Sequence, residues 1–106
     1  MVNDRMAQPQ ALLVQLPFTV GHSSDHEPAL DRLVAALAEA VTAGGAGEFD
    51  GDEVGEGSTT LFFYGPNADE LFEAIEPLLV KRRTARGTRI IKRYGPPGAP
   101  EHVVML

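Results

Sequence analysis

The stretch from Gly47 to Gly57, GEFDGDEVGEG, is the part of this 106-residue chain whose residue types most suggest chemistry, because five acids and four glycines fall within eleven positions. Acids and glycines in one loop are typical of calcium sites. An EF-hand loop starting at Asp50 would have carboxylates at positions 1 and 3. However, Val54 would stand at position 5 and Leu61 at position 12, where ligands are required. The stretch therefore fails as a calcium loop at two positions.

A second group of potential ligands consists of His22, Asp25 and His26, in the spacing HxxDH. Imidazole and carboxylate groups suit zinc or nickel, so these residues together with Asp50 or Asp52 could form a metal site or perform acid–base chemistry. The same positions also suit ordinary loop and helix-cap residues. A metal-dependent enzyme is therefore one hypothesis, and no cofactor is predicted.

The amino-acid composition narrows the classes of protein to which this chain could belong. The chain has no cysteine, which excludes disulfides and cysteine-ligated zinc and fits a cytoplasmic protein. The early apolar run ALLVQLPF lacks the flanks of a signal peptide and is too short to span a bilayer, so no membrane association is expected. The length predicts one domain over residues 1–106, with a flexible polar segment at 1–10.

The charges are divided along the chain. Between Leu33 and Val80 there are ten acids and no Lys or Arg, whereas Lys81 to Arg93 contains seven bases and no acid. A net charge of −6 disfavours nucleic-acid binding, and the basic run KRRTAR has no interleaved aromatic residues. This distribution favours a basic protein partner or association of two copies, although an ordinary solvated surface would also account for it.

Hydrophobic periodicity predicts alternating strands and helices. One helix follows a capping box at Ser24 and ends at Gly44-Gly45, and a second begins after Asn67 and kinks or ends at Pro77. Asp50-Gly51 suits a tight turn, but the turn could instead lie at 55–57, which would make 48–54 one longer strand. The other predicted strands are 11–18, 59–64 and 88–94, and a short fifth strand could form at 102–106.

This order of elements predicts an α+β, ferredoxin-like βαββαβ fold. In that fold two helices cover one face of a four-stranded antiparallel sheet with strand order 4-1-3-2. Arg89, Lys92 and Arg93 suit an edge position for the last strand, because charge discourages further pairing. The second sheet face would be bare unless a partner or another copy covers it.

Two segments resemble small uncharacterised bacterial proteins: DGDEVGEGSTTLFFYGPNADELFEAIEPLL, from Asp50 to Leu79, and RYGPPGAPE, from Arg93 to Glu101. The shared features are the DG pair, the GxG pair, an aromatic strand, and a helix with a polar cap that ends in PxL. The resemblance implies a ferredoxin-like fold and transfers no catalytic residue. Small acidic proteins of this kind include immunity-type inhibitors of bacterial toxins, which is an analogy of class.

The main functional prediction is therefore a non-enzymatic, immunity- or antitoxin-like binding protein that blocks a basic partner through its acidic surface. The residues predicted to contact the partner are Phe49, Asp50, Asp52, Glu53 and Glu56. The alternatives are a small-molecule-sensing or regulatory module that forms a homodimer through the open sheet face, and the metal-dependent enzyme described above.

Overall fold

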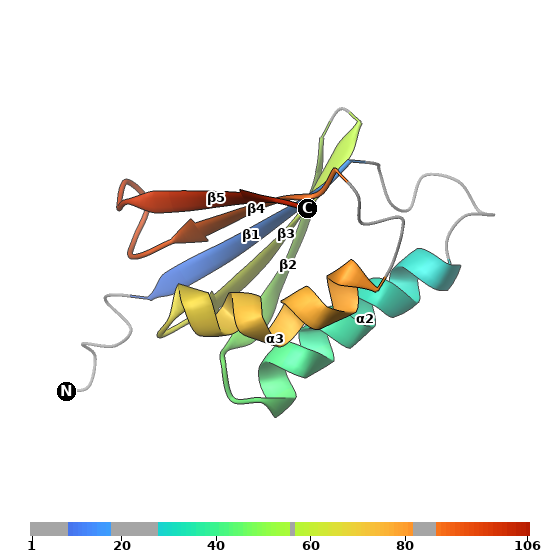
Figure 1. Cartoon of the computed structure of the whole chain (residues 1–106), viewed down its shortest axis with the longest axis horizontal. Coiled ribbons are helices and arrows are strands. Elements are labelled where there is room, and N and C mark those ends of the chain that lie inside the picture. The colour runs from blue at the N-terminus through green and yellow to red at the C-terminus, as the bar shows by residue number, and fades with distance from the viewer. Residues whose placement is uncertain (1–8, 18–27, 56, 82–86) are drawn as a thin grey trace.

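The computed structural model describes residues 9–17, 28–55, 57–81 and 87–106 (Figure 1). In these ranges five strands and two helices follow one another along the chain. They are β1 (Gln10–Leu16), α2 (Pro28–Ala43), β2 (Glu48–Gly55), β3 (Ser58–Gly65), α3 (Ala68–Val80), β4 (Arg89–Arg93) and β5 (Glu101–Met105).

The strands form one open sheet in the order β2-β3-β1-β4-β5, and every neighbouring pair is antiparallel. The α+β class is confirmed, and the arrangement is of the ferredoxin-like type. The short fifth strand considered at 102–106 is confirmed as β5. The sheet therefore has five strands instead of four, and its order differs from the predicted 4-1-3-2 because β5 continues it beyond β4. The edge position predicted for β4 is therefore wrong: Arg89 and Arg93 pair with Met105 and Glu101 of β5.

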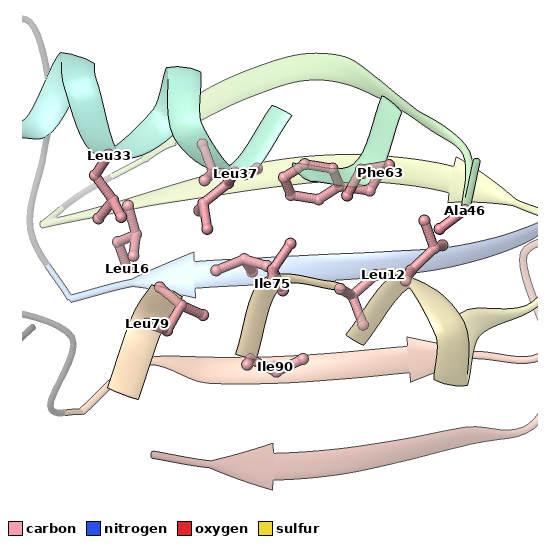
Figure 2. Packing of buried hydrophobic residues seen from close by; sticks show 13 residues of the cluster. Leu12, Leu16, Leu33, Leu37, Ala46, Phe63, Ile75, Leu79 and Ile90 are labelled. Atoms are coloured by element: carbon pink, nitrogen blue, oxygen red, sulfur yellow. The ribbon is translucent and has the colours of Figure 1, made fainter. Parts of the chain in front are cut away.

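Both helices lie against the same face of the sheet, as Figure 1 shows. Along β1, Leu12, Val14 and Leu16 point toward the helices and are fully buried. Figure 2 shows Leu12 and Leu16 among side chains from α2 and α3, such as Leu37 and Ile75. Burial of this aliphatic layer is the main source of stability in a domain of this size.

The sequence predicts the end of α2 correctly. The Gly45 N–H donates to the Thr42 carbonyl and the Ala46 N–H donates to the Val41 carbonyl, which is a Schellman cap with Gly45 at a φ of 75°. The predicted capping box at Ser24 lies outside the described residues, but α2 begins at Pro28, where proline suits a first turn.

The start of α3 is also as predicted. The Asn67 side chain accepts a hydrogen bond of 3.1 Å from the Glu70 N–H. The Ala68 N–H is satisfied by Gln10 Oε1 at 2.7 Å, which ties the helix to β1. The prediction that this helix could end at Pro77 is wrong. The helix continues to Val80, and Leu79, beyond the proline, is fully buried in the core.

Candidate functional site

The acidic stretch lies on β2, which forms one edge of the sheet because, among the described strands, it pairs only with β3. Glu48, Asp50, Asp52 and Glu53 are exposed, and Glu56 lies outside the described residues. Within the described ranges the only salt bridge joins two other residues, on α3 and β4. The carboxylates of β2 therefore face solvent without a basic neighbour in the described part of the chain.

The pair Asp50-Gly51 forms a β-bulge rather than the predicted tight turn. Phe49 pairs with Phe63 and Gly51 pairs with Phe62, so Asp50 is an extra residue on β2. Gly51 has a φ of 120°, which is open to glycine and strained for other residues. The chain instead reverses between Gly55 and Ser58, so the alternative of one longer second strand is confirmed.

The bulge determines which face of the sheet each acid occupies. Asp52 pairs with Leu61, a core residue, and therefore lies on the helix-covered face. Glu53 pairs with Thr60 and Glu48 pairs with Tyr64, on the opposite face. The acids thus line both sides of the edge instead of converging on one point.

Phe49 does not project from this edge into solvent. Its side chain is half-buried and packs against the core, where its ring lies 5.2 Å from the ring of Phe63 at an interplanar angle of 46°. This packing anchors the start of β2 to the sheet. Most of the ring is thus engaged within the domain itself.

The residues considered as metal ligands are not brought together in the described part of the chain. His22, Asp25 and His26 lie outside it. Among the described residues no group of three or more His, Cys, Asp or Glu side chains is placed to hold a metal ion. Leu61, which occupies the closing position of the rejected calcium loop, is fully buried in β3.

A polar cluster that the sequence did not reveal lies where α3 begins and β4 ends. Asp69 Oδ1 accepts hydrogen bonds from the Tyr94 hydroxyl at 2.9 Å and from Lys92 Nζ at 3.1 Å. Lys92 Nζ also lies 4.6 Å from the centroid of the Phe72 ring, a cation–π contact. His102 pairs with Lys92 across the β4–β5 ladder.

The electrostatics of this cluster favour a structural role. The hydrogen bond from Tyr94, followed by that from Lys92, lowers the pKa of Asp69, and the bond to Asp69 raises the pKa of Tyr94. These shifts favour the ionised form of Asp69 and the neutral form of Tyr94 at neutral pH, which are their ordinary states. Neither group is therefore tuned for proton transfer. The cluster connects the end of β4 to the first turn of α3.

No signal in the sequence could have paired these residues, because Tyr94 is 25 positions and Lys92 is 23 positions from Asp69. The sequence Tyr-Gly-Pro recurs at the end of β3 and directly after β4, but this recurrence does not point to Asp69. The two tyrosines differ in the structure. Tyr94 donates to a helix residue, whereas Tyr64 belongs to β3 and pairs with Glu48 and Ala11.

Comparison with known proteins gives no match to a protein-family model, to a curated protein or to a solved structure. The resemblance to small bacterial proteins therefore stays a prediction. Neither of the helices within the described ranges is long and apolar enough to cross a membrane.

Proposed function

We propose that this chain is a non-enzymatic binding protein of the immunity or antitoxin type, which engages a basic partner along the acidic edge strand β2. The observation that carries the proposal is that β2, which has a neighbouring strand on one side only within the described ranges, also bears four exposed carboxylates. Edge backbone groups and charges together offer a partner both hydrogen bonds and electrostatic attraction.

The backbone supplies the first part of the interaction. An edge strand directs alternate N–H and C=O groups away from its sheet neighbour, so an extended segment of a partner can add a sixth strand beside β2. Such a segment would present its side chains alternately to the two sheet faces. Asp52 on the helix-covered face and Glu53 on the other face could then both meet basic side chains.

The charges supply selectivity. A second β2 pairing with this edge would bring carboxylates against carboxylates, which opposes edge-to-edge association of identical copies. The bulge at Asp50 interrupts the regular ladder and has the same effect. A partner segment rich in Lys or Arg would instead be attracted to these carboxylates. The edge therefore distinguishes basic from acidic segments by charge.

A peptide of alternating Lys and Val, compared with one of alternating Glu and Val, tests this proposal. The basic peptide should shift the backbone amide resonances of β2, and the acidic peptide should not. Reversing Asp50 and Asp52 to Lys should weaken binding of the basic peptide by about tenfold at low salt, because exposed charge pairs contribute about 0.2–1 kcal/mol each. The effect should diminish in high salt.

The matched control reverses Glu39 on α2 and Glu73 on α3 to Lys, since both are exposed acids on helices and not on the edge strand. This variant changes the net charge equally and should bind the basic peptide almost as well as the native chain. If both variants lost affinity for the basic peptide equally, the binding would depend on the net charge of the protein and not on the β2 edge. Amide shifts confined to another element would place the binding surface elsewhere and refute the proposal.

A further inference from the structure

The sheet face opposite the helices carries an apolar row that crosses all five strands. Because Leu12, Val14 and Leu16 of β1 face the helices, Leu13 lies on the other side. The ladder registers align Gly51, Phe62, Leu13, Ile91 and Val103 in one row. Neither helix covers this row (Figure 1). Val103 is 41% exposed, Gly51, Phe62 and Leu13 are partly exposed, and Ile91 is 9% exposed. We call this side of the sheet the open face.

Opposite charges flank the apolar row on the open face. On β2, Glu48 and Glu53 lie on either side of it, in the rows that contain Tyr64 and Thr60. On β4, Arg93 and Arg89 occupy the same two rows, on either side of Ile91. Across the four strands from β2 to β4, the charge on the open face therefore changes from negative at β2 to positive at β4.

We infer that the open face is the interface of a symmetric dimer in which a second copy of this chain is the occupant. A two-fold axis parallel to the strands, between β3 and β1, would place β2 over β4 of the second copy and β3 over β1. Glu48 would then oppose Arg93 of the second copy, and Glu53 would oppose Arg89. Two-fold symmetry would repeat both pairs, which gives four complementary contacts.

In two of the opposed pairs, those of Gly51 and Tyr64, the same arrangement places a small residue against a large one. Gly51, which has no side chain, would oppose Ile91 of the second copy, and Phe62 would oppose Leu13. In the adjacent row Tyr64 would oppose Ala11. Facing sheets pack about 10 Å apart with their strands within about 30° of each other, so large residues must meet small ones across the gap.

Other symmetric arrangements lose the charge match. An axis perpendicular to the strands would place Glu48 opposite Glu53 and Arg93 opposite Arg89. An axis along β1 would place Glu48 opposite Glu101 of β5. Since like charges across an interface are unfavourable, the axis between β3 and β1 is the one that the charges select.

The expected dimer is weak. Four strands spaced by about 4.8 Å, each contributing five residues of about 3.4 Å, give a patch of roughly 19 by 17 Å. This area is well below the roughly 800 Å² per partner of a standard interface, so we expect association at micromolar or higher concentration. Because the contacts at its corners are ionic, added salt should weaken the dimer.

Sedimentation equilibrium over a range of concentrations, with circular dichroism to confirm folding, tests the inference. Arg89→Glu should raise the dimer dissociation constant about tenfold or more, because each dimer contains two Glu53–Arg89 contacts. The double variant Glu53→Arg with Arg89→Glu exchanges the two charges and should restore dimerisation to within a few-fold. Arg32→Glu, an exposed change on α2, is the matched control and should leave the dissociation constant unchanged.

A native chain that stays monomeric at millimolar concentration would overturn the inference. A dimer that Arg89→Glu does not weaken, or that the charge exchange does not restore, would refute the proposed axis. These outcomes are independent of peptide binding at the β2 edge, because that experiment changes Asp50 and Asp52.

Discussion

The hydroxyl of Tyr94 donates a hydrogen bond of 2.9 Å to Asp69 Oδ1, which joins the segment after β4 to the first turn of α3. Lys92 donates to the same oxygen at 3.1 Å. Two residues of the C-terminal part of the chain thus hold the N-terminus of a helix that also bonds to Gln10 of β1. The position of α3 on the sheet is therefore fixed at its first turn from two strands.

The hydrogen bond between Tyr94 and Asp69 predicts that the stability of the domain falls at both acid and alkaline pH. We call these two pH ranges the acid limb and the alkaline limb. The lowered pKa of Asp69 adds stability above its unfolded pKa of about 3.9, and this contribution is lost as the pH falls through the folded pKa. The raised pKa of Tyr94 adds stability below an unfolded pKa of about 10, and this is lost as the pH rises through the folded pKa.

Tyr94→Phe should flatten both limbs, because it removes the first cause of each shift. Urea-unfolding midpoints measured across the acid and alkaline ranges would show this. Tyr64→Phe, at the other Tyr-Gly-Pro sequence, is the control and should retain both limbs. Parallel curves for the native chain and Tyr94→Phe would mean that the bond contributes nothing in solution.

Gly65→Ala should destabilise the domain strongly. A Cβ at Gly65 would lie 2.1 Å from the backbone carbonyl oxygen of Ala46, where the segment before β2 crosses the end of β3. Since backbone atoms must move to relieve this overlap, we expect a loss of about 2 kcal/mol or more in the free energy of unfolding. Urea denaturation measures it.

Gly55→Ala is the matched control, because a Cβ there would lie 3.9 Å from Ser58 Oγ, an ordinary contact. Its effect should stay within about 0.5 kcal/mol. If both substitutions were tolerated equally, the close approach of the two backbone segments would not exist in solution.

The contact between Phe49 and Phe63 should appear as coupling in a double-mutant cycle. We expect Phe49→Leu and Phe63→Leu to couple by about 0.5–1.5 kcal/mol, because tilted aromatic pairs contribute this much beyond burial of their area. Phe62 lies on the opposite face, so Phe62→Leu should couple with Phe49→Leu by less than about 0.5 kcal/mol. Equal coupling in the two cycles would contradict the packing of Phe49 into the core.

Thr59→Val should stabilise the domain. The Thr59 side-chain oxygen is fully buried and has no hydrogen-bond partner among the residues that the structure describes. Replacing this hydroxyl with a methyl group of similar size removes a desolvation cost, so we expect a gain of about 1 kcal/mol in the free energy of unfolding. Thr60→Val, on the open face, should change stability by less than about 0.5 kcal/mol. A loss of stability on Thr59→Val would show that the hydroxyl is satisfied.

The sequence by itself determined the elements and the class of the fold. The glycine pair that ends α2, the Asn67 cap of α3 and the alternating apolar residues of the strands are local signals, because each acts through residues within a few positions. The pattern at Asp50-Gly51 was ambiguous for the same reason. A glycine with positive φ suits a tight turn or a bulge equally, and only pairing with β3 selected the bulge.

Relationships across the sheet were decided by the tertiary structure alone. The pairing of β5 with β4, the bond from Tyr94 to Asp69 and the alignment of Glu53 with Arg89 in one row join residues separated by eight positions or more. No local propensity encodes such pairs, because they depend on strand register and on how the helices lie on the sheet. The sequence thus determined that β2 is acidic, and the tertiary structure decided that β2 is an edge strand.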